Sequence, residues 1–182
     1  MKKKSDQFSA ADVMATALFI EIFNDVEVGW VRENLEKFVE FAYAINFEGG
    51  DCFDHHQKGE GNGKRENGVP YSSAGIFWRY IGREIIGDDD PNVEMIWSII
   101  DEDLITNIDA HDNGMRVSYL SCAISAFNPT CQEKYLSSDE CFKNAVSVVR
   151  QIFQRKLEHA RAKALDTSKI KKVFEASPRG EN

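Results

Sequence analysis

Apolar and polar residues alternate along the chain with a spacing that changes from one segment to the next. The first segment has helical spacing, with apolar residues at Val13, Ala17, Leu18, Ile20, Ile22 and Phe23. Asp12 lies close to the expected helix start, where a carboxylate is favoured. Residues 25–31 then alternate as in a strand, residues 33–42 return to helical spacing, and residues 43–47 form a second strand candidate. This order predicts an α/β fold with a mainly parallel sheet flanked by helices.

The second half of the chain shows helical spacing throughout. A helix is predicted over residues 74–86, and Ser72 and Ser73 can cap its start. Its buried stripe is expected to contain Ile76, Phe77, Tyr80, Ile81 and Ile85. Further long helices are predicted from about residue 92 to 109 and from about residue 139 to 163. The inward residues of the last helix are expected to be Phe142, Val146, Val149, Phe153 and Leu157.

Length and charge limit the function classes. The 182 residues suit one domain, predicted over residues 1–165, with a C-terminal helix and tail over 166–182. The net charge of -8 disfavours a large nucleic-acid surface, although a short strand end or a mononucleotide held by metal ions is compatible with it. No segment has the pattern of a signal peptide or a membrane span, so a cytoplasmic protein is expected. Residues 59–68 hold four glycines and several charges, which indicates a mobile surface loop.

Two short clusters of ionisable residues could carry chemistry. Asp54, His55 and His56 follow an inferred strand and a Gly-Gly turn, and Asp109 and Asp112 lie in the segment IDAHDNG. Carboxylates and imidazoles that converge on one point suit a divalent metal with a phosphoryl substrate. Taken alone, the histidine pair would be a surface turn and the second cluster a helix C-terminal turn. Together they predict a shared site.

Four segments resemble, in the same order, motifs of the Myg family of DHH phosphoesterases. They are FDHHQKG, SSAGIFW, IDAHDNG and CAISAFNPT. The resemblance extends from about residue 8 to about residue 163. It implies a DHH phosphoesterase-like fold and a two-metal hydrolase that cleaves phosphoester bonds of RNA or nucleotides, with Mn or Mg as cofactor. A small phosphorylated substrate or a short RNA end is the expected partner.

The resemblance also assigns roles to individual residues. Asp54 and His56 would be catalytic, with His56 touching the substrate phosphate and Asp54 orienting the histidine pair. His55 would bind a metal, and the other proposed ligands are Asp12, Asp109 and Asp112, of which one late aspartate is needed. Ser72 and Ser73 are the candidate substrate-binding residues.

The chain departs from the family pattern near its start. Lys4, Ser9 and Ala11 stand where the family has His, His and Asp, and Phe47 stands where a bridging aspartate is expected. One metal site is therefore expected to be lost. The residues after about 166 are too few for the family's further C-terminal domain, which favours a small substrate.

Two alternatives to an enzyme stay open. One is a catalytically impaired descendant that binds a ligand or protein partner through the same pocket. The other is a structural role for Asp54, His55 and His56, with the helices around Trp78 and Trp97 forming a homodimer surface.

Overall fold

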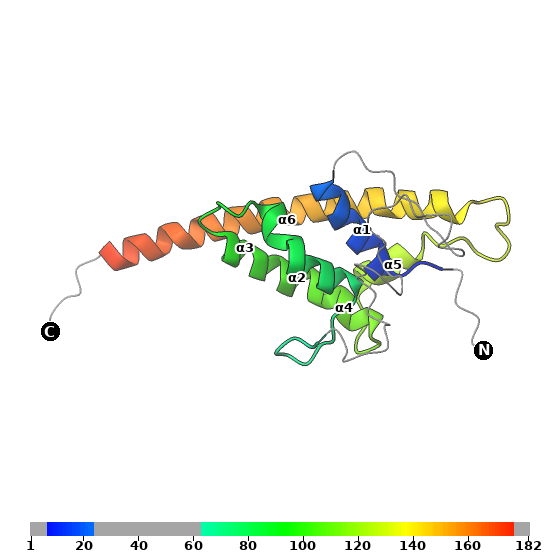
Figure 1. The fold of residues 1–182 in the computed structure, drawn as a ribbon, viewed down its shortest axis with the longest axis horizontal. Coiled ribbons are helices and arrows are strands. Elements are labelled where there is room, and N and C mark those ends of the chain that lie inside the picture. The colour runs from blue at the N-terminus through cyan, green and yellow to red at the C-terminus, as the bar shows by residue number, and fades with distance from the viewer. Residues whose placement is uncertain (1–6, 24–62, 177–182) are drawn as a thin grey trace.

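The computed structural model describes residues 7–23 and 63–176, whose regular elements are helices (Figure 1). In chain order these are α1 (Ala10–Ile22), α2 (Ser73–Ile86), α3 (Val93–Ile100), the π-helical turn η2 (Asp101–Ile105), α4 (Thr106–Asp112), α5 (Tyr119–Ser125) and α6 (Ser138–Ala176). Within the described residues the only β-type pairing is one isolated antiparallel bridge, between Lys64 and Pro70.

The expected α/β fold with a mainly parallel, DHH phosphoesterase-like sheet is wrong for the described residues, which form a helical bundle without a sheet. The sheet expectation rested on residues 25–31 and 43–47. Like the helix expected at 33–42, these segments lie outside the described residues. The helices that are described bury their apolar faces against one another, and this packing builds a core without a sheet.

Helix α1 lies inside the bundle, in contact with α2, α4, α5 and α6. Nearly every residue of its first two and a half turns is buried, which is the pattern of a helix surrounded by protein. Its start is fixed by a capping box, in which Ser9 Oγ accepts from Asp12 N at 3.2 Å and Asp12 Oδ2 accepts from Ser9 N at 2.9 Å. Asn128 holds the incoming chain, because its side chain exchanges two hydrogen bonds of 3.0 Å with the backbone of Phe8.

The three helices predicted in the second half are confirmed. The helix expected over 74–86 is α2, and the one expected over 92–109 is the continuous run from Val93 to Asp112. The inward residues predicted for α6 are all buried. Tyr80 is a correction, because 66% of its surface is exposed although it was expected in the buried stripe of α2.

The helix from Val93 to Asp112 contains one irregular turn. The backbone keeps right-handed helical angles throughout, but Thr106 N donates to Asp101 O, five residues back. In a regular α-helix residues five apart point about 140° away from each other. The π turn adds one residue to the turn, so Asp101 and Thr106 share a face. Such turns occur often at functional sites.

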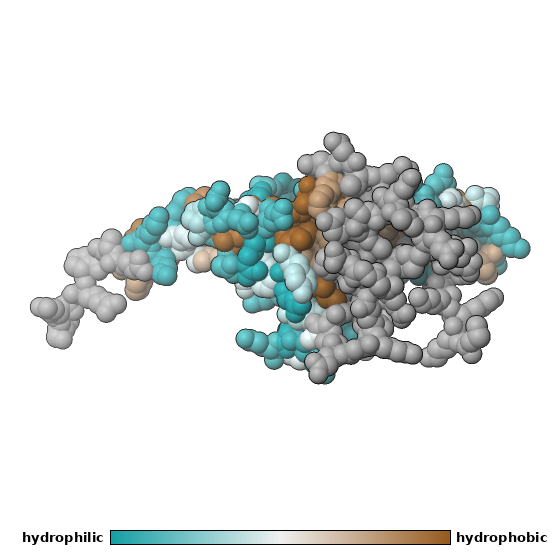
Figure 2. All heavy atoms as spheres, in the orientation of Figure 1, coloured by the Kyte–Doolittle hydropathy of each residue, from teal (hydrophilic) through white to brown (hydrophobic). Residues whose placement is uncertain are grey.

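Helix α6 runs along the bundle, and its last part, drawn orange to red, projects beyond the other described helices (Figure 1). The helix continues without a break past residue 165, where a domain boundary is expected. The position of that boundary stays a prediction. The projecting part is largely hydrophilic with scattered apolar residues (Figure 2). No helix in the described part of the chain is long and apolar enough to cross a membrane.

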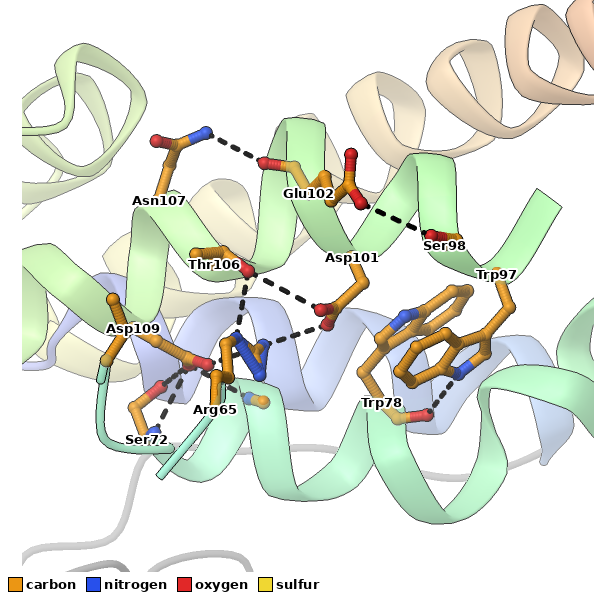
Figure 3. Close-up of polar contacts among 12 residues, drawn as sticks. Arg65, Ser72, Trp78, Trp97, Ser98, Asp101, Glu102, Thr106, Asn107 and Asp109 are labelled. Atoms are coloured by element: carbon orange, nitrogen blue, oxygen red, sulfur yellow. Dashed lines mark hydrogen bonds and ion pairs between the residues drawn. The ribbon is translucent and has the colours of Figure 1, made fainter. Parts of the chain in front are cut away.

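Two tryptophans lock α2 to α3. Trp78 and Trp97 stack with ring centroids 6.2 Å apart and planes 11° from parallel, and Trp97 Nε1 donates to Trp78 O at 3.3 Å (Figure 3). Trp78 is fully buried inside the chain. Gly82 makes this stack possible, because a Cβ at that position would lie 2.7 Å from Trp78 Cδ2 and 2.8 Å from Trp97 Nε1.

We predict that Gly82→Ala lowers stability by about 1–3 kcal/mol, since the added methyl group must displace an indole. The sign of the change in the free energy of unfolding is informative, because a Gly to Ala change inside a helix otherwise stabilises by up to about 1 kcal/mol. Urea unfolding followed by tryptophan fluorescence measures the effect. Glu84→Ala, an exposed change on the same helix, is the control and should be close to neutral. A Gly82→Ala protein at least as stable as the wild type would contradict the prediction.

Candidate functional site

A tight turn before α2 carries an arginine into the interior. Arg65 N donates to Val69 O at 2.9 Å, Gly68 N donates to Arg65 O at 2.8 Å, and Gly68 adopts a positive φ of 82°. The turn directs the Arg65 side chain into the protein, where only 6% of it is exposed. Residues 63–68 are otherwise exposed, as expected for a surface loop, and the burial of Arg65 is the one departure from that expectation. Residues 59–62 lie outside the described part.

Arg65 ties the turn to the long helix (Figure 3). Its Nε donates to Thr106 Oγ1 at 2.8 Å, and its Nη2 donates to Asp101 Oδ1 at 2.8 Å. The same Nη2 lies 2.7 Å from Asp109 Oδ2, an ion pair by distance that lacks the alignment of a hydrogen bond. The three partners share a face because of the π turn between Asp101 and Thr106.

Asp109 in turn caps α2 from outside that helix. Its Oδ1 accepts from Ser72 N at 3.2 Å and Gly75 N at 3.1 Å, and from the Ser72 hydroxyl. These donors at a helix start have no partner within their own helix, so the carboxylate satisfies them and also meets the positive end of the helix dipole. Gly75 is required for the approach, because a Cβ there would lie 2.7 Å from Asp109 Cγ.

One guanidinium therefore faces two carboxylates in a dry environment. Burial raises the pKa of Asp109 to about 6, although Arg65 and the hydrogen bonds from Ser72 and Gly75 act in the opposite direction. Burial also raises the pKa of Asp101, again against the attraction of Arg65. Burial therefore outweighs the attraction of Arg65 and makes protonation of both carboxyl groups easier than it is in water.

The other residues of IDAHDNG also take part in the local structure. His111 Nδ1 accepts from Ser118 N at 3.1 Å. Asn113 Nδ2 donates to Pro70 O at 3.2 Å and to Asp109 O at 2.9 Å, which ties the end of α4 to the turn before α2. Gly114 has a positive φ of 69°, the conformation that a helix C-terminus commonly requires of glycine.

The predicted site residues fall into two groups. Asp54, His55 and His56 lie outside the described residues, as do Lys4 and Phe47. The remaining candidates lie at the start of α1, at the start of α2 and in α4, and α1 and α2 both contact α4. They are Asp12, Ser72, Ser73, Asp109 and Asp112.

The two serines are fully buried. Ser72 uses both of its donors on Asp109, whereas the Ser73 hydroxyl has no hydrogen-bond partner among the described residues. Substrate binding by either serine stays a prediction.

The described side chains alone do not fit a metal ion. No group of three His, Cys, Asp or Glu side chains in the described part of the chain could hold one. At Asp109 an added cation would lie beside the Arg65 guanidinium, 2.7 Å from the same carboxylate oxygen, and would be repelled. A metal site would therefore need at least one ligand from outside the described residues.

Sequence reasoning missed Arg65, the residue that organises this region. Its run of charges and glycines is typical of a surface loop, and nothing in the run itself marks one cation as buried. The available signal lay elsewhere. Asp101 and Asp109 occur in a helix whose other residues are mostly apolar, and buried carboxylates require a cation.

Comparison with known proteins places the chain in a family. The chain belongs to the MYG1 exonuclease family, described as Uncharacterised protein family (UPF0160), whose pattern matches residues 3–181. It is 25% identical over 157 residues to the MYG1 exonuclease of Bos taurus, covering 71% of this chain and 41% of that protein. For the MYG1 exonuclease of Homo sapiens the identity is 24%, covering 71% and 42%. The chain thus spans about two fifths of the length of these relatives. No solved structure matches it.

We predict that Arg65→Ala lowers the free energy of unfolding by about 3–5 kcal/mol, because it leaves two buried carboxylates without a cation. Lys64→Ala is the matched control: Lys64 is the neighbouring cation but is exposed, so its loss should change stability by less than about 0.5 kcal/mol. Urea unfolding measures the free energy of unfolding of the two variants. Equal effects would contradict the buried role of Arg65.

We also predict a pH dependence that Asp109→Asn removes. The pKa of Asp109 is about 6 in the folded chain and close to the ordinary 3.8 when unfolded. The folded state therefore binds more protons between these values, so the contribution of Asp109 to stability falls as pH rises from about 4 to about 6 and is constant above. Relative to the variant, the wild type should lose roughly 2–3 kcal/mol over that range. Urea midpoints across the range test this, and parallel curves would contradict it.

Proposed function

We propose that the chain carries the phosphoester-hydrolysing function of its family, with RNA or nucleotides as substrate and Mn or Mg as cofactor. The main support is membership of the family over residues 3–181, together with the name exonuclease borne by its relatives. The retained Asp54, His55 and His56 supply the residue types that such chemistry needs. A bound divalent cation would lower the pKa of a water molecule and so provide the nucleophile.

The geometry favours one of the two late aspartates as the metal ligand of this proposal. Asp109 is held by Arg65 and by the start of α2, so its charge already has a partner. Asp112, one turn further along α4 and half-buried, is the other late candidate. Asp12, at the start of α1, remains a candidate ligand from a helix that contacts α4.

Arg65 and Asp109 act in this proposal as positioning residues. Asp109 fixes the first turn of α2, and Arg65 fixes Asp109 against the long helix. The Ser73 hydroxyl, which has no partner among the described residues, is held in that turn. A rigid first turn would keep this hydroxyl and the end of α4 in a constant relative position, as a site built on helices requires.

A second candidate function is a non-catalytic ligand-binding role, and one observation favours it. Ser9 and Ala11, which replace two metal ligands of the family pattern, have structural tasks instead. Ser9 caps α1, and Ala11 is fully buried in the core. Neither residue supplies a metal ligand of the kind that it replaces.

We expect the full chain to hydrolyse a short fluorescent oligouridine RNA when manganese is present. His55→Ala and Asp112→Asn should each lower the rate by more than the roughly 10–100-fold that loss of an outer-shell partner costs. Asp103→Asn removes an exposed carboxylate from the same long helix and should leave the rate unchanged. Product release on a gel, with kcat and KM for each variant, measures the effect.

Calorimetry with manganese separates the two candidate functions. Equal rates for the wild type and His55→Ala would reject the enzyme. Manganese binding without turnover would then support the ligand-binding role. Tight binding of two manganese ions per chain, with turnover that His55→Ala abolishes, would reject the ligand-binding role.

A further inference from the structure

The second half of α6 carries an excess of positive charge. Residues 150–176 contain eight Lys or Arg and three Asp or Glu, in a chain whose net charge is -8. Two of the three acidic residues are already paired within the helix. Glu158 lies 2.7 Å from Arg161, and Asp166 lies 3.8 Å from Lys169. The other cations of this segment therefore give a positive region on an otherwise acidic protein.

The same helix leaves the bundle near its end (Figure 1). The Ser168 hydroxyl still donates to Asn92 Oδ1, but residues 169–174 are all exposed. Two large apolar side chains lie in this exposed part, where 66% of the surface of Ile170 and 83% of that of Phe174 is exposed. Neither side chain gains from the core, so a ligand that buries both would be favoured.

Two exposed lysines lie on the same face of α6 as these apolar side chains. Lys156, Lys163 and Ile170 follow one another at intervals of seven residues, and Phe174 lies four residues further along. Seven residues make almost two helical turns, so these four side chains, called here the α6 stripe, form one line along the helix. In the described part of the chain no ion pair joins either lysine of the stripe to a carboxylate.

Charge and apolar character together indicate an anionic lipid surface as the ligand. Lysines attract lipid phosphates, and apolar side chains on the same helix face enter the boundary between headgroups and acyl chains. An acidic peptide or a nucleic acid would use the lysines, but the aliphatic Ile170 offers a base no ring to stack on. The helix would lie on the membrane, because no helix in the described part of the chain is long and apolar enough to cross one.

We propose that the α6 stripe binds membranes that contain anionic lipids. Ile170 and Phe174 enter the layer below the headgroups, and Lys156 and Lys163 contact the phosphates through long side chains whose carbon stems stay near the apolar layer. The remaining, acidic surface is repelled by the same membrane, so the stripe also sets the orientation of the bundle. This inference goes beyond the proposed function and does not depend on it, since it requires neither a metal nor turnover.

The test is sedimentation of the full chain with lipid vesicles in the presence of EDTA. Vesicles of equal parts phosphatidylcholine and phosphatidylglycerol should bind the chain, and vesicles of phosphatidylcholine alone should bind it far more weakly. Phe174→Ser should weaken binding at least about tenfold, because the buried area of the ring is lost. Lys163→Gln should weaken it about fivefold, the effect of one lysine near a charged surface.

A second readout reports insertion directly. Phe174→Trp keeps an aromatic ring at the position and should bind as the wild type does, since tryptophan suits the membrane interface. Its additional tryptophan emission, measured against the wild type, should move to shorter wavelength when the anionic vesicles are added. An emission that stays at the wavelength of an indole in water, with the protein bound, would contradict insertion and overturn the proposal.

Matched controls come from another part of the chain. Tyr119 is 91% exposed at the start of α5, and Lys134 is an exposed cation between α5 and α6. Tyr119→Ser and Lys134→Gln should bind vesicles as the wild type does. Equal binding to both kinds of vesicle, unchanged binding by Phe174→Ser, or equal losses in the controls would overturn the proposal. Oligouridine binding that needs Lys163 and Phe174, in a chain that does not bind vesicles, would also overturn it and assign the stripe to RNA.

Discussion

The contact between Arg65 and the two aspartates of the long helix is the constraint on which the rest of this region depends. It joins the turn before α2 to η2 and α4, and through Asp109 it fixes the first turn of α2. The turn and the first turn of α2, which follow each other in the sequence, are thereby joined to a distant helix. Because a buried ion pair gains little over well-packed apolar side chains, we infer that its value here lies in fixing the orientation of these segments. Arg65 also lies over the ring of Tyr71, which directly precedes α2.

Two backbone features make this contact possible, and each has a cost. The π turn replaces regular helical hydrogen bonds, and Gly75 in the first turn of α2 is a weaker helix former than alanine by about 1 kcal/mol. The π turn brings Asp101 and Thr106 to one face, and Gly75 lets Asp109 approach the amide groups of α2. Neither feature would be needed to pack two helices by apolar contact alone. Their presence together indicates that the polar contact determines the local geometry, and apolar packing accommodates it.

The long helices of the second half could be predicted because they bury apolar stripes, as α6 does from Phe142 to Leu157, whereas the short helix α5 was not predicted. The expected sheet is wrong for the described residues, whose core is built by helices. The expectation rested on short alternating segments at residues 25–31 and 43–47, which lie outside the described part. Tyr80 was misplaced because its apolar ring fits a stripe whose edge only tertiary structure defines. The site was harder to predict than the fold. Asp109 was recognised as important, but its partner Arg65 lies in a run of polar residues, and no periodicity in that run indicates which side chain turns inward.

Residues of the IDAHDNG segment have structural roles, and the motif is therefore weaker evidence for catalytic activity. Asp109 caps α2, Asn113 bonds Pro70 and Gly114 allows the turn after α4, so all three would be needed to fold the chain whether or not it hydrolyses anything. The motif therefore supports the fold of the family more strongly than its reaction. The opposite holds at the start of the chain, where Ser9 and Ala11 fit the structure well but cannot replace the ligands of the family pattern. The choice between an enzyme and a binding protein therefore depends mainly on the roles of Asp54, His55 and His56.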